Sequence, residues 1–271
     1  MTYTGFVLYS FIRMRVLLIS DVHSNFEALS AVLSAEAGFD WVWCAGDFVD
    51  YGISPKPVID WFRNHRAESR LVKGNHDEHL VNVWKSGVSK TIAPMQFKWV
   101  HQNCLQLDAT RVSFLDSLPE IISFEQDGRY YLMAHRFDKT VPYRDINSIE
   151  EFDAFWNANT PESYHNAFER RIIVGHTHRQ CAHYLYGNRM WINPGSISYR
   201  RPDEHDKSAQ YAVIEDGTII FKRIPYDRSI QFAAAEQYGK NKSMMETEVQ
   251  DFYFFFGDAK TTRDPLPTGA V

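Results

Sequence analysis

RIIVGHTHRQ, residues 171–180, carries two histidines, His176 and His178, directly after a short apolar run. A short apolar run that ends at a glycine is typical of a buried β-strand. Alternate side chains of an extended segment project from the same side, so the two imidazoles are expected to share one face. A single histidine at a strand end is more often a surface or hydrogen-bonded residue. The meaning of this pair therefore depends on how the other strands end.

The N-terminal third of the chain repeats this arrangement. The apolar run at residues 16–19 ends in SDVHSN, and WVWCAGD (residues 41–47) and RLVKGNHD (residues 70–77) also end in polar residues. A helix is expected from residue 26 to a stop at Gly38, and a second over residues 58–66. Strands that alternate with helices predict an α/β fold with a largely parallel sheet at its start.

The remainder of the chain predicts helices followed mostly by strands. Three segments have helical patterns: residues 93–107, 109–118 and 148–170. Three dipeptides are hairpin signals: Asp127-Gly128, Gly187-Asn188 and Asp216-Gly217. No linker-like tract separates these parts, so we expect one domain over residues 1–271. Its expected additions are an N-terminal extension at residues 1–13, a cap insertion at residues 137–170 and a weakly patterned C-terminal extension at residues 227–271.

The composition excludes several classes of function. The chain of 271 residues is 44% apolar and can bury a large core, and its net charge of −5 gives no global basic field for nucleic acid or membrane. Its three cysteines are odd in number and widely spaced, which argues against a disulfide framework. The apolar segment at residues 5–12 is too short to span a bilayer and lacks the features of a signal peptide. We expect a cytoplasmic protein without membrane association or a stable nucleic-acid complex, and the oligomeric state stays open.

The apolar runs end in side chains that can bind metal ions. The crevice of an open α/β sheet lies beyond the carboxyl ends of its strands, so residues at these ends are expected to converge. Carboxylates, an amide oxygen and imidazoles together suit Mn, Fe, Zn, Co or Ni, and suit Ca poorly. The residues at these ends are Asp21, His23, Asp47, Asn75, His76, His135, His176 and His178.

Two divalent ions follow naturally from this set of residues. If Asp47 bridges them, the protein ligands supply two negative charges against four positive ones, and the excess attracts a phosphate. Two ions about 3.5–4 Å apart clamp the attacking and leaving oxygens of an in-line displacement, and they lower the pKa of a bound water towards ~7. The site would then have a hydroxide nucleophile without a serine or cysteine.

The order of the motifs resembles that of a known family. DVH, GD, GNHD, a strand-ending histidine and GHTH, in this order, resemble the motifs of the calcineurin-like metallophosphoesterase superfamily. SDVHSNFEALSAVL (residues 20–33) and NPGS (residues 193–196) are similar to its small bacterial and archaeal phosphodiesterase branch. Each motif alone is weak, but five in order are a strong signal. The resemblance covers roughly residues 14–224 and implies a four-layer αββα sandwich, with two mixed β-sheets flanked by helices.

The resemblance also implies a role for each matching residue. One metal ion is held by Asp21, His23, Asp47 and His178, and a second by Asp47, Asn75, His135 and His176. His76 corresponds to the histidine that contacts the scissile phosphate and protonates the leaving oxygen, which is a general-acid role. Asp77 either orients His76 or simply faces the solvent.

Two departures from the family pattern affect the expected substrate. Tyr51 stands where the protein-phosphatase form of the GD motif has a phosphate-binding arginine. Arg136 follows His135 where many relatives have a glycine; it either reaches a phosphate beside Asn75 or turns outward to pair with an acidic neighbour. The aromatic residues of the 137–170 insertion either stack on a nucleobase or belong to the core.

Three functions remain open at this stage. The first is a metal-dependent phosphodiesterase or phosphatase that acts on a small phosphorylated molecule, such as a nucleotide or dinucleoside polyphosphate. The second is a phosphoprotein Ser/Thr phosphatase, which Tyr51 disfavours. The third is a catalytically inactive binding scaffold, as in a retromer subunit of this superfamily, which would be expected to have lost ligand residues.

Other candidate ligands match no motif. Cys181 lies near His178 and is either a ligand or small core filler. The histidines interpreted as uninvolved in the site are His65, His79, His101, His165, His183 and His205.

Overall fold

Two five-stranded mixed sheets form the centre of the protein in the computed structural model, which describes residues 14–137, 148–199, 201, 204, 206–241 and 243–257. The strands of the first sheet, in spatial order, are β10 (Thr218–Ile224), β9 (Ala209–Glu215), β1 (Arg15–Ile19), β2 (Trp41–Cys44) and β3 (Ser69–Leu71). Strands β1, β2 and β3 are parallel to one another, and β9 is antiparallel to both of its neighbours, β1 and β10.

The second sheet has parallel strands at its centre and an antiparallel strand at each edge. Its strands, in spatial order, are β4 (Ile121–Gln126), β5 (Arg129–Ala134), β6 (Arg170–Ile173), β8 (Arg189–Asn193) and β7 (Cys181–Leu185). The expected hairpins at Asp127-Gly128, Gly187-Asn188 and Asp216-Gly217 are confirmed as β4–β5, β7–β8 and β9–β10.

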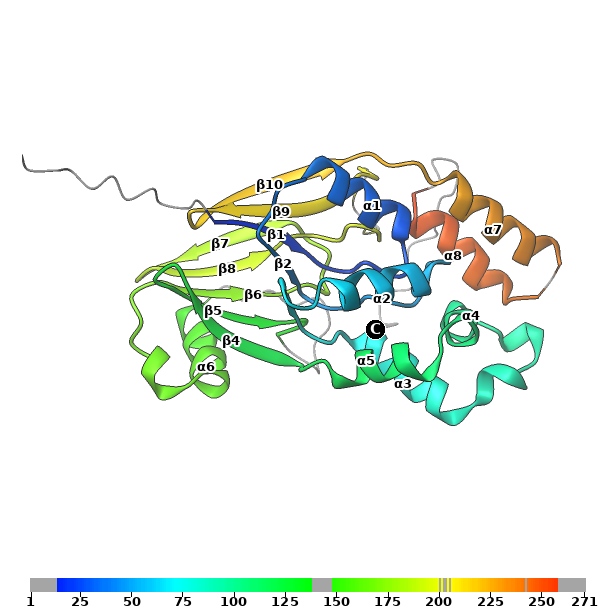
Figure 1. The fold of residues 1–271 in the computed structure, drawn as a ribbon, viewed down its shortest axis with the longest axis horizontal. Coiled ribbons are helices and arrows are strands. Elements are labelled where there is room, and N and C mark those ends of the chain that lie inside the picture. The colour runs from blue at the N-terminus through cyan, green and yellow to red at the C-terminus, as the bar shows by residue number, and fades with distance from the viewer. Residues whose placement is uncertain are drawn as a thin grey trace, which may run out of the picture.

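Helices cover the outer faces of both sheets (Figure 1). Those that pack outside the first sheet are α1 (Phe26–Ala35), α2 (Pro55–Asn64), α3 (Asn75–Ser86), α4 (Trp99–Gln106) and α5 (Ala109–Ser117). The second sheet is covered by α6 (Ile149–Asn159). A C-terminal pair, α7 (Ser229–Lys240) and α8 (Glu246–Phe255), lies at one end of the molecule. The predicted four-layer αββα sandwich is confirmed.

Because alternate side chains of a strand point to opposite faces, the first sheet contributes to two apolar layers, one against the helices and one against the second sheet. Along β1, Val16 and Leu18 face the second sheet, whereas Leu17 and Ile19 face the helices. The layer between the sheets contains Trp43, which is fully buried and packs its ring 4.8 Å from the ring of Phe124. This packing fixes the two sheets relative to each other, and the loops beyond their strands with them.

Several predicted helices begin or end elsewhere. The helix predicted over residues 93–107 begins at Trp99, because Pro94 starts a separate 3-10 turn and the chain is extended at Phe97 and Lys98. The helix predicted over residues 148–170 ends at Asn159, because the residue before Pro161 is held extended.

Other differences concern the two ends of the chain. The helix predicted over residues 58–66 is α2, which begins three residues earlier with Pro55 in its first turn. The C-terminal extension, which was expected to have little regular structure, contains the two helices α7 and α8. The predicted extension at residues 1–13 lies outside the described residues, as do residues 138–147 of the predicted cap and residues 258–271. Among the helices described, none is long and apolar enough to cross a membrane.

Candidate metal centre

The residues predicted from the strand ends come together at one edge of the sandwich. Asp21 and His23 follow β1, Asp47 follows β2, and Asn75 begins α3 after β3. From the second sheet, His135 follows β5, and His176 and His178 follow β6. The site therefore needs both sheets in register, because each contributes ligands that the other does not have.

Asp21, His23 and His178 form the first group of potential ligands. Their candidate ligand atoms lie within 4.8 Å of one another. Nε2 of His178 is 3.1 Å from Oδ1 of Asp21, and Nε2 of His23 is 3.9 Å from the same oxygen. The carboxylate and the ring of His23 are buried. One carboxylate and two imidazoles converging in this way could hold a divalent transition-metal ion.

Asp47, His135 and His176 form the second group. Their ligand atoms also lie within 4.8 Å of one another, and Nε2 of His135 is 3.0 Å from Oδ2 of Asp47. Nδ1 of His135 donates a 2.7 Å hydrogen bond to the backbone carbonyl of Ala45, because a carbonyl can only accept. That bond directs Nε2 towards Asp47, and a hydrogen bond of this kind is the usual outer contact of a metal-binding histidine.

The two groups are adjacent, and Asp47 connects them. Nε2 of His23, from the first group, is 3.9 Å from Oδ2 of Asp47, from the second. Both ring nitrogens of His23 and the amide oxygen of Asn75 are buried, yet within the described part of the chain they form no hydrogen bond. Buried polar atoms are nearly always satisfied, so these atoms fit positions that a metal ion would occupy.

The backbone of the site is strained. Asp21, His23, Asp47, His176 and His178 all have positive φ, between 44° and 62°. This left-handed region is uncommon for residues other than glycine and costs of order 1–3 kcal/mol at each position. Five such residues in one cluster indicate that the surrounding fold holds the ligands in place against local preference.

Two glycines allow the loops to approach closely enough. A Cβ atom on Gly74 would lie 2.0 Å from Oδ1 of Asp47, and one on Gly175 would lie 1.9 Å from Oγ of Ser20. The backbone N–H groups of Val22 and His23 both donate to the carbonyl of Asp47, at 2.8 and 3.0 Å. The glycines of the GNHD and GHTH motifs are thus needed for the close packing of the loops that carry the candidate ligands.

Asp77 has neither of the two roles expected for it. Its side chain is fully buried and does not face the solvent, and its carboxylate accepts hydrogen bonds from the backbone N–H groups of Asp47, Phe48, Val49 and Gly74 at 2.8–3.2 Å. Burial and the nearby charge of Asp47 raise the pKa of Asp77 to about 7. Asp77 therefore holds the loop that carries Asp47 against the start of α3.

Asp50 orients His76 instead. Its Oδ2 lies 2.9 Å from Nδ1 of His76, whose backbone N–H donates to Oδ1 of Asp47 at 2.9 Å. Burial alone would lower the pKa of His76, but the carboxylates of Asp47 and Asp50 raise it to about 9. The two carboxylates thus favour the protonated ring, with Nε2 left to face a substrate. Asp50 was missed from the sequence because an acidic residue three positions after Asp47 had no motif of its own.

The imidazoles of the two groups do not share one protonation state. Burial alone would lower the pKa of His135, but the carboxylate of Asp47 raises it to about 9. Burial opposes ionisation of Asp47, but the neighbouring His135 and His76 hold its pKa well below its usual range. Burial lowers the pKa of His23 and of His176 to about 4. Neutral histidine and ionised aspartate are the forms that bind a metal ion.

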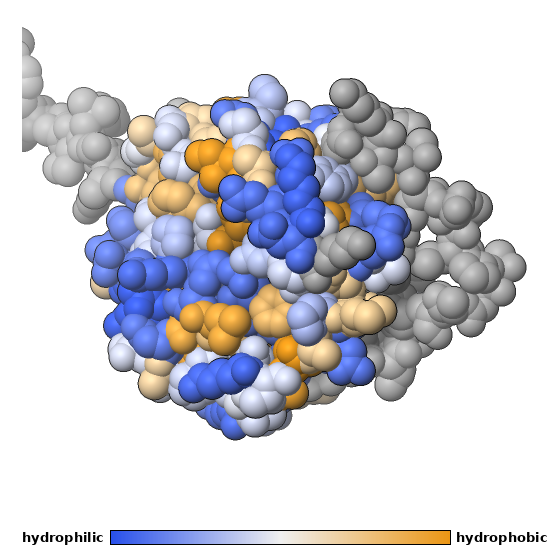
Figure 2. All heavy atoms as spheres, turned by 90° about the vertical axis from the view of Figure 1, so that its right-hand side faces the viewer, coloured by the Kyte–Doolittle hydropathy of each residue, from blue (hydrophilic) through white to orange (hydrophobic). Residues whose placement is uncertain are grey.

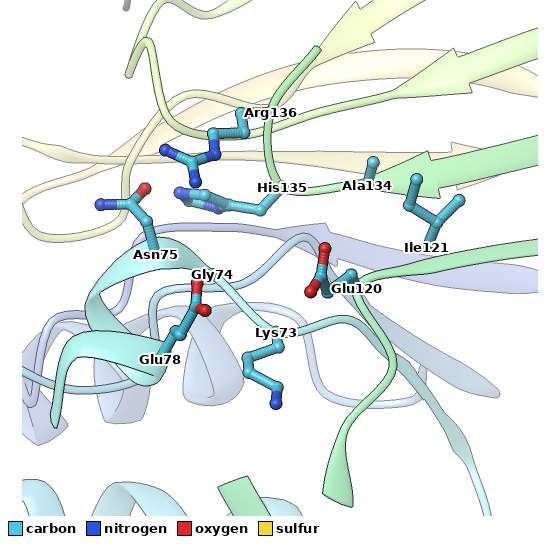
Figure 3. Close-up of a pocket in the computed structure, with 9 residues that line it drawn as sticks. All are labelled: Lys73, Gly74, Asn75, Glu78, Glu120, Ile121, Ala134, His135 and Arg136. Atoms are coloured by element: carbon cyan, nitrogen blue, oxygen red, sulfur yellow. The ribbon is translucent and has the colours of Figure 1, made fainter. Parts of the chain in front are cut away.

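Arg136 lies at the second group. A small pocket of about 40 Å³ opens there between the end of β5 and the start of α3. Figure 3 shows the guanidinium of Arg136 beside the ring of His135 and directed towards Asn75, with the carboxylates of Glu78 and Glu120 on the other side of the pocket. Arg136 therefore points into this pocket, which Asn75 and two acidic residues also line.

The structure also places the residues that were expected to be uninvolved. Among the cap aromatics, Phe152 and Trp156 are buried against the second sheet and belong to the core, whereas Phe168 is 78% exposed and does not. Cys181 begins β7 and belongs to neither ligand group. No other histidine of the described residues is in either group, and His205 lies outside these residues.

Asn193 of the NPGS motif has a supporting role that the sequence analysis did not assign. Its side chain is fully buried, and its Nδ2 donates to the carbonyl of Gly175 and to Oγ1 of Thr177, at 2.8 and 2.9 Å. It thereby fixes the turn between His176 and His178. Its signal in the sequence is its place at the end of β8, directly beside β6.

Comparison with known proteins identifies the family. Residues 14–216 match the model of the Calcineurin-like phosphoesterase superfamily domain. The chain belongs to this superfamily. The matched range contains both ligand groups and His76, whereas α7 and α8 of this phosphoesterase-superfamily member lie beyond it.

Individual relatives extend this result. An uncharacterized protein of Methanocaldococcus jannaschii is 26% identical over 236 residues, which cover 80% of this chain and 89% of that protein. A symmetrical bis(5'-nucleosyl)-tetraphosphatase of Serratia proteamaculans is 37% identical over 81 residues, only 28% of either chain. The crystal structure of a metallophosphoesterase from Sphaerobacter thermophilus has the same fold, with a TM-score of 0.63 at 24% identity, over 88% of this chain and 98% of that one.

Replacing Asp77 tests its assignment as the support of the Asp47 loop. Asp77→Ala leaves four backbone N–H groups of the buried loop without an acceptor, so we expect the free energy of unfolding to fall by about 3 kcal/mol or more, measured by urea denaturation. The matched control is Glu78→Ala, the exposed acidic neighbour on α3, which should change it by less than about 0.5 kcal/mol. Equal effects of the two substitutions would contradict the assignment.

Proposed function

We propose that the protein is a metal-dependent phosphoesterase that hydrolyses a small phosphorylated molecule or nucleotide at a dinuclear centre. The observation that carries the proposal is the pair of adjacent ligand groups connected through the buried carboxylate of Asp47. Membership of the calcineurin-like phosphoesterase superfamily supports the same reaction class.

The ligand sets follow from the two groups. Asp21, His23 and His178 would hold one divalent ion, and His135, His176 and Asn75 the other, with Asp47 shared between them. The mixture of imidazole and oxygen donors suits Mn, Fe, Zn, Co or Ni. Such ions would supply Lewis acidity at the phosphate and activate a water molecule.

His76 is the proposed general acid. Its raised pKa favours the protonated ring, and it lies next to Asp47 without being part of either ligand group. Asp50 fixes the ring by its contact with Nδ1, so the proton available to a leaving oxygen is the one on Nε2. General acids of this kind contribute about 10²–10⁴-fold to the rate, and most where the leaving group is poor.

Arg136 and Asn75 are the proposed substrate-binding residues. They approach each other at the mouth of the pocket beside the second ligand group (Figure 3). A guanidinium can bind two oxygens of one phosphate in a bidentate manner, and the amide of Asn75 can donate to a third. The two side chains could thus contact a phosphoryl group that is bound at the centre.

A nucleotide or dinucleoside polyphosphate is the substrate class that we favour. The similarity to a bis(5'-nucleosyl)-tetraphosphatase supports this choice, although it covers only part of either chain. A phosphoprotein phosphatase is less well supported, because Tyr51 provides no cation at the position of that family's arginine. The scaffold alternative is disfavoured because all seven ligand positions are filled by suitable residues.

Metal content and hydrolysis together test the proposal. With Mn, Co, Ni or Fe supplied, we expect two ions per chain and turnover of bis-p-nitrophenyl phosphate or p-nitrophenyl phosphate. Asp47→Asn should weaken both sites and abolish turnover, whereas His178→Ala and His176→Ala should each remove one ion before the other, measured by elemental analysis. A wild-type protein that hydrolyses neither ester with any of these metals would exclude the enzymatic function.

His76→Ala separates acid catalysis from metal binding. We expect full metal content and a fall in kcat of about 10²-fold or more with phenyl phosphate, whose leaving group is poor, but a smaller fall with p-nitrophenyl phosphate. Asp50→Asn should act in the same direction and more weakly. The control is His79→Ala, an exposed histidine on the same helix. If His76→Ala lost metal ions instead, its assignment as the acid would be wrong.

A further inference from the structure

Three aromatic rings from distant parts of the chain form a stack beside the candidate metal centre. Tyr199 stacks on Tyr51 with ring centroids 5.0 Å apart and on Phe255 with centroids 4.0 Å apart. Two rings cannot stack on one face of a third at these distances, so Tyr199 lies between the other two. The stack, which we call the aromatic wall, joins the GD loop, the segment after NPGS and the C-terminal helix α8.

The aromatic wall contacts the residues that would perform the reaction. The ring of Tyr199 lies 5.3 Å from that of His23 and 5.1 Å from that of His178, both in the first ligand group. The ring of Tyr51 lies 5.4 Å from that of His23 and 4.9 Å from that of His76. The wall therefore borders the first ligand group, and its Tyr51 end lies beside the proposed acid.

The backbone at Tyr51 is held in an unfavourable conformation. Asp50 and Tyr51 have φ values of 75° and 62°, a region that bulky residues rarely adopt. The buried Asn103 of α4 holds this turn, because its Oδ1 accepts from the N–H of Asp50 and its Nδ2 donates to the carbonyl of Gly52, at 3.0 and 2.7 Å. The fold thus directs a large aromatic ring to this position at a cost of order 1–3 kcal/mol.

The C-terminal helices anchor the other end of the wall. Gln231 of α7 is fully buried and donates to the side-chain oxygen of Asn25, the residue that caps α1 directly after the first metal loop. Arg228 donates to the carbonyl of Phe256, and the indole N–H of Trp99 donates to the carbonyl of Glu248, at 2.8 and 3.0 Å. These bonds fix Phe255 against Tyr199. The end of the molecule that bears these helices shows apolar residues only in small groups among hydrophilic ones (Figure 2).

We propose that the aromatic wall is the leaving-group subsite and that it favours phosphate esters with a flat aromatic leaving group. Tyr51 is the specificity-determining residue, and Tyr199 and Phe255 are positioning residues that act through it. The inference rests on the proposed function, because it uses the placement of the leaving group beside His76. Substrate selection would then depend on the loop that carries Asp47 and Tyr51 and on the C-terminal helices, and not on residues 137–170.

The chemistry of Tyr51 explains this preference. A phenol ring supplies no positive charge, so it adds nothing to the binding of a second phosphate. It supplies an aromatic surface next to the proton of His76, and aromatic pairs contribute about 0.5–1.5 kcal/mol beyond the area that they bury. A leaving group with a large flat ring gains from this surface, whereas a small or aliphatic one does not.

Two aryl esters with leaving groups of similar acidity test the proposal. The measured quantity is the ratio of kcat/KM for 2-naphthyl phosphate to that for phenyl phosphate, which cancels the fraction of active protein in each preparation. Tyr51→Leu should lower this ratio about three- to tenfold, which is the range of one aromatic pair. Tyr51→Phe should keep it, and Phe255→Leu should lower it less than Tyr51→Leu. Tyr184→Leu, an exposed tyrosine on β7, is the control and should leave it unchanged.

Binding without turnover separates this proposal from the proposed function. By calorimetry, Tyr51→Leu should weaken binding of 1-naphthylphosphonate about three- to tenfold and leave methylphosphonate unaffected, at unchanged metal content. If the wild-type protein hydrolyses neither ester but this binding difference is found, the proposed function fails and the aromatic wall stands only as a binding surface for flat aromatic groups. If hydrolysis is found and neither the ratio nor the binding responds to Tyr51→Leu, the subsite is wrong and the function stands.

Discussion

The carboxylate of Asp47 is the interaction on which the rest of the site depends. It is buried, and it lies 3.0 Å from His135 of the second sheet and 3.9 Å from His23 of the first. Its other oxygen accepts the backbone N–H of His76. A buried anion of this kind is costly unless it is paired, so the surrounding imidazoles and any bound cation offset its desolvation. The centre therefore couples the two sheets electrostatically as well as by packing.

The remaining elements hold Asp47 and its partners in position. Asp77 binds the backbone of the Asp47 loop, Asn193 fixes the turn between the two histidines after β6, and the core around Trp43 holds the sheets in register. Left-handed backbone at five of the expected ligands shows that local preference alone would not produce this arrangement. Side chains that are already held in the binding geometry lose less conformational entropy when an ion binds, and this gain would offset the backbone strain.

Much of the fold and of the ligand set could be predicted from the sequence, because apolar runs and the polar residues at their ends are local signals. The roles of Asp50 and Asp77 could not be predicted in this way. Both are acidic residues close to a motif, and only the three-dimensional turn places one against His76 and buries the other under the Asp47 loop. The sequence did not indicate helix α8, because this helix is apolar on several sides. Phe252, Phe254 and Phe255 are all buried, so the segment has no clear amphipathic period. The contact between Phe255 of α8 and Tyr199 joins residues that are 56 positions apart, so the local sequence of neither segment indicates it.

The central claim is that Asp47 is shared by two metal ions. The most direct measurement is anomalous diffraction at the manganese absorption edge from crystals of the manganese-loaded protein. We expect two peaks about 3.5–4 Å apart on either side of the Asp47 carboxylate, one next to Asp21, His23 and His178 and the other next to His135 and His176. A single peak, or two peaks of which only one is in contact with Asp47, would contradict it.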